Sequence, residues 1–205
     1  MSVMTHPIPG AVPAVPRNPA LWRMSVDQYH RMIQTGILTE DDLVELLQGY
    51  VVEKSPTNPR HSQTSEMARD RIAGLLPAGY CVASQEPITT DDSEPEPDLS
   101  VIRGTRRQYL EHHPYPENVV LLIEVAGTSL NCDRSEKKRI YARARIPVYW
   151  IINIADRTIE VYTLPTGPDG VATYRKREPY GAEDEIPLVI DGQEAGRFRV
   201  AEALP

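Results

Sequence analysis

Three runs of β-branched and other apolar residues dominate the hydrophobic pattern in the middle of the chain. They occupy residues 97–102, 119–126 and 148–154, and a charged segment at 133–145 precedes the last of them. Short runs rich in Val and Ile are typical of strands, whereas apolar residues three or four positions apart indicate a helix. The pattern therefore predicts strand, strand, helix and strand, in this order.

Two of these predicted strands carry an acid near one end. Asp98 opens the first strand, and Glu124 lies near the end of the second. If the two strands pair in antiparallel fashion, both carboxylates project from the same end of the sheet. Asp98 could instead be a turn residue, since prolines and acids precede it. The corresponding alternative for Glu124, an exposed strand end, is weaker, because an acid within a buried apolar strand is costly unless a cation accompanies it.

The charged segment places one lysine on its inner face. The apolar positions of the segment are Ile140, Tyr141 and Ala144. A step of three or four residues back from them reaches Lys137, whereas Lys138 is rotated toward solvent. Because the helix connects two parallel strands, its start returns over the strand end that carries the acids. Asp133 is a candidate N-cap, so a surface ion pair between Asp133 and Lys137 stays open as an alternative.

A β-hairpin is predicted upstream of this region. Apolar residues at 44–47 and 50–53 flank Gly49, which favours a tight turn. Glu45 lies on the same strand face as Leu47. We interpret Glu45 as an ordinary edge residue and keep a role in the site as the alternative.

Two further helices are expected before the central strands. Ser25 begins a capping-box sequence that predicts a short helix to about residue 34. A second helix is expected over residues 61–76, and His61 begins it. A polar residue at a helix start usually serves capping or faces solvent, so His61 is a candidate site residue with a structural alternative.

The remaining pattern completes an α+β fold. Further strands are predicted at 80–85, 158–163, 171–177, 185–190 and 197–199, the later ones as an antiparallel extension. From His61 onward, the elements follow the order αβββαβ. The N-terminal helix and hairpin precede this core.

Composition limits the domain organisation and the class of partner. A chain of 205 residues with 40% hydrophobic and 25% charged residues predicts a single domain at 21–205, preceded by a proline-rich, extended or disordered arm at 1–20. The net charge of -7 argues against nucleic-acid binding through a broad basic surface, so any such binding must be local. The arm, the strands after residue 171 and Trp22 offer surface that a homodimer would cover.

The cysteines and the hydropathy pattern indicate the compartment. Cys81 and Cys132, in a strand-like and a loop-like context, have no metal-binding spacing and are expected to be free thiols. Nothing resembles a signal peptide or a membrane span. A cytoplasmic protein is therefore expected.

Several short motifs follow one another along the chain: the hairpin from Val44 to Gly49, Ser55-Pro56, His61, Pro97-Asp98, Ile123-Glu124-Val125, Asp133 with Lys137 and Tyr141, and Pro147 to Ile152. Together they resemble the Uma-two family of restriction-endonuclease-like proteins, within the PD-(D/E)XK nuclease superfamily. The resemblance covers residues 22–165. It implies a restriction-endonuclease-like mixed sheet.

The resemblance also implies a metal-dependent phosphodiester hydrolase acting on nucleic acid, with DNA as the expected substrate. Asp98 and Glu124 would be ligands of Mg²⁺ or Mn²⁺, and Lys137 the basic catalytic residue. In the superfamily the lysine usually follows the second acid by two residues, but here that position is Ala126, and Gly127 replaces the usual serine of the family. The family resemblance instead places the lysine on the following helix.

The chemistry explains why these residue types belong together. Carboxylate oxygens hold a hard cation that polarises a phosphate and lowers the pKa of an attacking water. A lysine beside them can stabilise charge that develops on the phosphate. Two alternatives remain: a catalytically silent binding or scaffold protein that retains the fold, and a hydrolase of a small phosphodiester, for which an acidic protein is less handicapped.

Overall fold

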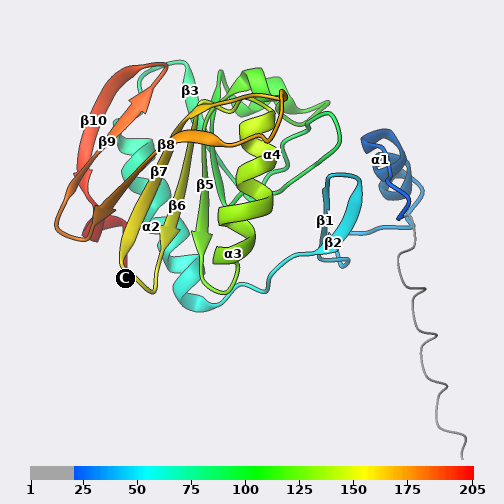
Figure 1. The fold of residues 1–205 in the computed structure, drawn as a ribbon, viewed down its shortest axis with the longest axis horizontal. Helices are drawn as coiled ribbons and strands as arrows, with labels where there is room; N and C mark the ends of the chain where they lie inside the picture. Colours follow the sequence, from blue (N-terminus) through cyan, green and yellow to red (C-terminus); the bar gives the residue numbers. More distant parts are fainter. Residues whose placement is uncertain (1–20) are drawn as a thin grey trace, which may run out of the picture.

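A six-stranded mixed sheet forms the centre of the computed structural model, which describes residues 21–205 (Figure 1). Its strands lie in chain order: β3 (Tyr80–Ser84), β4 (Leu99–Arg103), β5 (Val119–Ala126), β6 (Val148–Asn153), β7 (Thr158–Pro165) and β8 (Tyr174–Gly181). Strands β5 and β6 are parallel, and the other neighbouring pairs are antiparallel. The predicted arm at 1–20 lies outside the described residues.

The α+β class and the αβββαβ order are confirmed. Helix α2 (Pro59–Leu75) precedes β3. Strands β5 and β6 are parallel, so they need a crossover connection, and one helical segment provides it. This segment consists of α3 (Leu130–Cys132), a π-helical turn (Asp133–Lys137) and α4 (Lys138–Arg143). The acids were expected at one end of an antiparallel pair, and Leu99 does pair with Ile123.

The start of the crossover helix differs from the prediction. Ser129 occupies the N-cap position, so Asp133 lies inside the helix and is not its cap. Cys132 accordingly lies in the helix and not in a loop, although both cysteines are free thiols as expected. Ser129 and Asp133 are both good capping residues, so the local sequence did not decide between the two starts.

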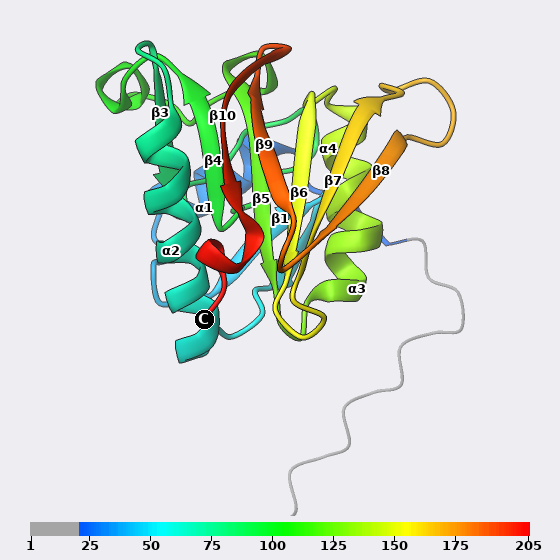
Figure 2. The same ribbon diagram turned by 90° about the vertical axis from the view of Figure 1, so that its left-hand side faces the viewer.

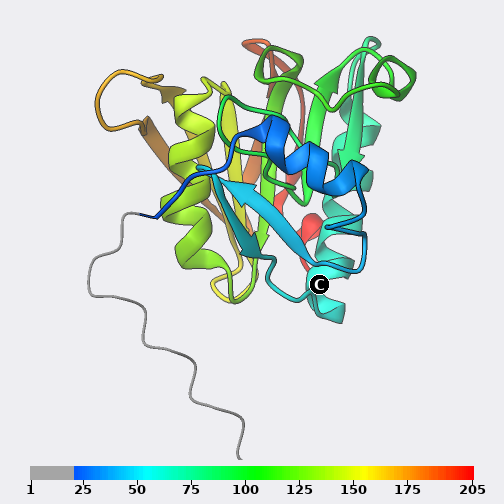
Figure 3. The same cartoon turned by 90° about the vertical axis from the view of Figure 1, so that its right-hand side faces the viewer.

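Two layers cover the two faces of the sheet (Figures 2 and 3). Helix α2 and the hairpin of β9 (Glu185–Ile190) and β10 (Gln193–Arg199) pack on one face, around a core that includes Ile72, Ile123, Trp150 and Phe198. The crossover helix and the hairpin of β1 (Val44–Leu47) and β2 (Tyr50–Glu53) lie on the other face, around Leu122, Tyr141, Tyr149 and Ile151. Side chains alternate along β5, so Glu124 faces the crossover helix together with Leu122 and Ala126.

The N-terminal elements follow the predicted pattern. Helix α1 (Val26–Gln34) begins with a capping box in which Ser25 and Gln28 bond to each other's backbone. In the hairpin turn, Gln48 and Gly49 both have positive φ, at 52° and 80°. A side chain at position 49 would also collide with Arg23 and Met24, so glycine is required there.

The C-terminal strands divide between the central sheet and a separate hairpin. Of the predicted antiparallel extension, β8 joins the central sheet, while β9 and β10 form a separate hairpin. Short 3₁₀ turns occur at Arg106–Tyr109, Pro116–Asn118 and Val200–Ala203.

Every helix within residues 21–205 is too short or too polar to cross a bilayer. Trp22 is 69% exposed, and the homodimer remains a prediction.

A buried acid fixes the crossover helix to the far strands of the sheet. Glu160 of β7 is 1% exposed and accepts hydrogen bonds from Arg134 on the π-helical turn, Arg177 on β8 and the Tyr162 hydroxyl. Burial alone would raise the pKa of Glu160, but hydrogen bonds from Arg177, Arg134 and Tyr162 outweigh it and lower the pKa to about 2. The carboxylate is therefore charged in the folded protein and joins three elements.

We expect Glu160→Gln to lower the free energy of unfolding at pH 7 by about 2 kcal/mol, because two arginines lose a buried anionic acceptor. The contribution of Glu160 is complete above its ordinary pKa of 4.5 and is lost as the pH falls toward 2, since the folded state has the lower pKa. Urea unfolding at pH 7 and pH 3 measures both effects. The gap between variant and wild type should shrink at pH 3.

Glu178→Gln is the matched control, because the Glu178 side chain is 43% exposed and pairs with Lys176. It should change the free energy of unfolding by less than about 0.5 kcal/mol at either pH. A Glu160 variant that behaves like this control would contradict the structural role of the buried carboxylate.

Candidate active site

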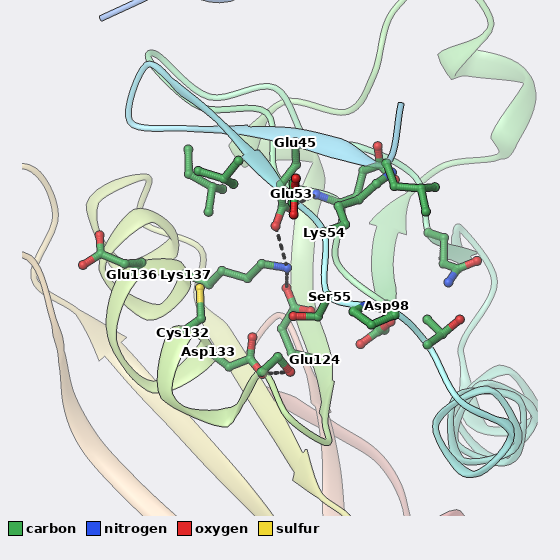
Figure 4. Close-up of a pocket in the computed structure, with 18 of the residues that line it drawn as sticks. Glu45, Glu53, Lys54, Ser55, Asp98, Glu124, Cys132, Asp133, Glu136 and Lys137 are labelled. Carbon is green, nitrogen blue, oxygen red and sulfur yellow. Dashed lines mark hydrogen bonds and ion pairs between the residues drawn. The ribbon is translucent and has the colours of Figure 1, made fainter. Parts of the chain in front are cut away.

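The five predicted site residues line one cavity of about 1180 Å³: Glu45, His61, Asp98, Glu124 and Lys137. The cavity lies between the β1–β2 hairpin, the first turn of α2, the entry to β4, the end of β5 and the crossover helix (Figure 4). Segments distant in sequence therefore meet at one sheet end. The predicted grouping of Asp98, Glu124 and Lys137 agrees with this arrangement, while their chemical roles remain predictions.

Lys137 points into the cavity between two carboxylates. Its Nζ lies 3.1 Å from Oε1 of Glu124 and 3.4 Å from Oε1 of Glu45, and its side chain is 11% exposed. Among residues 21–205, Lys137 forms ion pairs with Glu124 and Glu45 and none with Asp133. The alternative of a surface ion pair between Asp133 and Lys137 is therefore wrong. By contrast, Lys138 lies over the ring of Tyr162 at 5.5 Å, and Arg139 is exposed.

Glu45 is a buried residue and not the ordinary edge residue that we predicted. The residue is 5% exposed, and its second oxygen, Oε2, accepts a hydrogen bond of 3.0 Å from the backbone N–H of Glu96. The hairpin packs with its Glu45 and Leu47 face toward the sheet. Strand periodicity gave the correct face, but only the docking of the hairpin shows that this face is covered.

The docked hairpin is fixed by polar contacts at its turn. Gln48 donates from Nε2 to Glu136 at 2.6 Å and accepts from Arg139 at 2.9 Å, so the turn is bonded to the crossover helix. At its other end, Lys54 pairs with Glu96 at 2.7 Å. These contacts hold Glu45 over Lys137.

Asp98 and His61 form a second pair on the opposite side of the cavity. Oδ2 of Asp98 accepts hydrogen bonds from the backbone N–H of Val125 at 2.7 Å and from Nε2 of His61 at 3.2 Å. The bond to Val125 places Asp98 directly beside the strand residue that follows Glu124. The hydrogen bond with Asp98 raises the pKa of His61, which favours its charged form. His61 is therefore not only a helix-start residue.

Sequence reasoning gave no site role to Tyr141 and Asp133. The Tyr141 hydroxyl donates to Oε1 of Glu124 at 2.6 Å, and Asp133, which is 1% exposed, accepts from Ser129 Oγ at 2.7 Å. Tyr141 was assigned to the core from its apolar ring, although a buried tyrosine hydroxyl requires a partner. The spacing Asp133, Lys137, Tyr141 repeats every four residues and was the available signal.

Acids outnumber cations in the buried part of the site. Burial raises the pKa of Glu124 well above its ordinary value, and Asp133 and Asp98 add to the effect while Lys137 opposes it. Burial likewise raises the pKa of Asp133 to about 6, although the hydrogen bond from Ser129 lowers it in part. For Lys137, burial alone would lower the pKa, but the carboxylates of Glu124 and Glu45 raise it. The lysine is thus held in its charged form, and the cavity favours additional positive charge.

Two carboxylate oxygens remain available in this cavity. Within residues 21–205, Oε2 of Glu124 and Oδ1 of Asp98 accept no hydrogen bond, whereas the other oxygen of each acid accepts two. No group of three or more His, Cys, Asp or Glu side chains in this part of the chain could hold a metal ion alone. Mg²⁺ commonly takes one or two carboxylates and completes its shell with water and phosphate. The donor set of Asp98 and Glu124 fits such an ion.

Comparisons with known proteins agree with this architecture. The family model described as "Uma2: Putative restriction endonuclease" matches residues 26–196. A solved structure from Anabaena variabilis ATCC 29413, described as a putative nuclease belonging to DUF820, has a TM-score of 0.61 and 15% sequence identity. The similarity covers 88% of this chain and 97% of that one, and at this identity it shows a shared fold. None of the curated proteins matches the chain.

The buried charge cluster predicts a difference between two adjacent lysines. Lys137→Met should lower the free energy of unfolding by about 3 kcal/mol at pH 7, because Glu124 and Glu45 would lose their shared cation inside the protein. Lys138→Met removes the same charge from a half-buried side chain and should cost less than about 1 kcal/mol. Urea unfolding followed by circular dichroism provides the comparison. Equal losses would contradict the buried ion pairs.

Proposed function

Because the chain belongs to the Uma2 family of restriction-endonuclease-like proteins, we propose that it is a metal-dependent nuclease that hydrolyses phosphodiester bonds in DNA. The observation that carries this proposal is the meeting of Asp98, Glu124 and Lys137 in one cavity, with one free oxygen on each acid. Neighbouring strands supply the two carboxylates, and the crossover helix supplies the cation. Metal dependence and the DNA substrate are our inferences from this arrangement.

In this proposal Asp98 and Glu124 would hold Mg²⁺ or Mn²⁺, and each acid has one oxygen that accepts no hydrogen bond within residues 21–205. When bound, such an ion polarises the phosphate and lowers the pKa of a water molecule. Asp98 is held for this task by Val125 and His61, and Glu124 by Tyr141 and Lys137. Because these hydrogen bonds already fix both carboxylates, the side chains would lose little conformational entropy when an ion binds, which favours binding.

Lys137 contributes a fixed positive charge beside the two acids. Its ammonium group can donate to a phosphate oxygen on which negative charge develops. Glu45 acts as a positioning residue, since its carboxylate lies 3.4 Å from Nζ and its strand is fixed to the crossover helix. His61 is a positioning residue for Asp98 and lies close enough to the cavity to contact substrate or water.

A catalytically silent binding protein is the second candidate. The observation that favours it is that both Glu45 and Glu124 already neutralise Lys137, so the charge cluster can stabilise the fold without a metal. A silent protein would have no need of a free oxygen on Asp98. Metal affinity that depends on this acid therefore separates the two candidates.

Titration calorimetry with Mn²⁺ tests the metal site. Asp98→Asn should weaken Mn²⁺ binding at least 10-fold, because one of two carboxylate ligands loses its charge. Glu53→Gln is the matched control, since it removes the same charge from the wall of the same cavity without involving either proposed ligand. Equal weakening in both variants, or no Mn²⁺ binding by the wild type, would favour the silent protein.

The lysine pair tests the catalytic assignment. Lys137→Ala should lower metal-dependent cleavage of a DNA substrate by a factor on the order of 10² or more, the effect of losing one electrostatic donor. Lys138→Ala should change little beyond the salt dependence, although it removes the same charge. Both variants are assayed at a temperature at which circular dichroism shows them folded. A similar loss in the two variants would indicate general attraction of the substrate and would contradict the role of Lys137.

A further inference from the structure

A second cavity, of about 480 Å³, lies beside the first at the same end of the sheet. Its walls come from the first turn of α2, the segment after β5, the turn between β6 and β7, and residues 204–205. In Figure 2 the start of α2, the β6–β7 turn and the C-terminal residue lie together at the lower edge of the sheet. The carboxyl ends of parallel strands, here β5 and β6, are common positions for ligand sites.

The two cavities share the chain segments that separate them. Thr57 and His61 line the first cavity, and Asn58 and Arg60 line the second. After β5, Gly127 and Thr128 line the second cavity, and Ser129 lines the first. A chain molecule that leaves the first cavity across these segments would therefore enter the second.

The second cavity has the opposite charge character to the first. Arg60 and Arg157 line it, and none of its lining side chains is acidic, whereas buried carboxylates dominate the first cavity. Neither arginine pairs with an acidic side chain within residues 21–205, and residues 1–20 contain no Asp or Glu. The side chain of Arg157 donates one hydrogen bond, of 2.9 Å, to a main-chain oxygen of Pro205, the last residue of the sequence, so one of its donors is already used by a carboxyl oxygen. Most of the donors of the two guanidinium groups remain available.

The position of Arg60 is unfavourable for the helix itself. Helix α2 has 17 residues, Asn58 caps it, and its first turn contains no acid. The helix dipole disfavours a positive side chain at this end, and it favours an anion there. Arg60 and the helix start thus both direct positive potential into the second cavity.

We propose that the second cavity binds a backbone phosphate of a DNA strand, through Arg60 and Arg157, while an adjacent phosphodiester of that strand occupies the first cavity. This inference rests on the proposed nuclease function and adds a site for a neighbouring phosphate of the DNA substrate. A small phosphodiester has one phosphate and fills the first cavity alone. The second cavity also supplies the local positive site that a protein of net charge -7 needs in order to hold a polyanion.

Fluorescence anisotropy with a labelled single-stranded DNA oligonucleotide in the presence of Ca²⁺ tests the site. The double variant Arg60→Ala/Arg157→Ala should weaken binding at least 10-fold at low salt, and the slope of log K against log salt should decrease in magnitude by about 1. Arg107→Ala/Arg175→Ala is the matched control, because both side chains are exposed and form no ion pair within residues 21–205. The control should bind as the wild type does.

A second variant separates binding from folding. Arg60→Glu should weaken oligonucleotide binding more than Arg60→Ala, yet it should leave the melting temperature equal or slightly higher, since an acid suits the first turn of α2. Hydrolysis of bis(p-nitrophenyl) phosphate should not change in any of these arginine variants, because this substrate carries a single phosphate. An equal loss of its hydrolysis and of oligonucleotide cleavage would overturn the assignment of a separate site.

The outcomes distinguish the two proposals. Arginine-dependent DNA binding without any cleavage by the wild type would support the phosphate site and contradict the nuclease function. Cleavage by the wild type with equal binding in the arginine and control variants would support the nuclease function and overturn the phosphate site. The absence of oligonucleotide binding by the wild type would also overturn the phosphate site.

Discussion

The ion pairs of Lys137 with Glu124 and Glu45 constrain the rest of the structure. Charges removed from water require partners, and each of these three groups belongs to a different element: the crossover helix, the central strand β5 and the N-terminal hairpin. The sheet and the helix could pack without the hairpin, but the lysine would then have one anionic partner instead of two. The hairpin therefore completes the charge cluster and also closes one wall of the cavity.

The π-helical turn in the crossover helix allows several polar side chains to face the cavity at once. In a regular α-helix each residue advances by about 100°, so positions separated by four residues drift steadily around the axis. A π-helical turn contains more residues per turn and reduces this drift. Asp133 and Lys137 mark the bounds of the turn, and Tyr141 follows four residues later, with all three buried toward the sheet. Arg134, on the same turn, reaches the other way to Glu160.

Local patterns in the sequence were sufficient for most of the fold and for the grouping of Asp98, Glu124 and Lys137. Strand alternation and helical periodicity act over a few residues, and β5 and β9 have the predicted bounds. The burial of Glu45 could not be predicted in this way, because it depends on how a separate hairpin docks on the sheet. The hydrogen bond of Tyr141 to Glu124 and the helix start at Ser129 likewise depend on tertiary packing, which overrides the local preference of a residue.

Because Lys137 lies on a helix, its distance from Glu124 depends on how the helix packs against the sheet. The position two residues after Glu124, where the resemblance to PD-(D/E)XK nucleases would predict a lysine, holds Ala126, which is 1% exposed and packs beneath the crossover helix. A lysine there would share a strand with Glu124, and the strand alone would fix their separation. With Lys137 in its place, that separation depends on the packing of helix against sheet, which Ile140 and Tyr141 maintain on one side and the Gln48 contacts on the other. The small Ala126 side chain permits this close approach, so the alanine at this strand position and the inward position of Lys137 are parts of one arrangement.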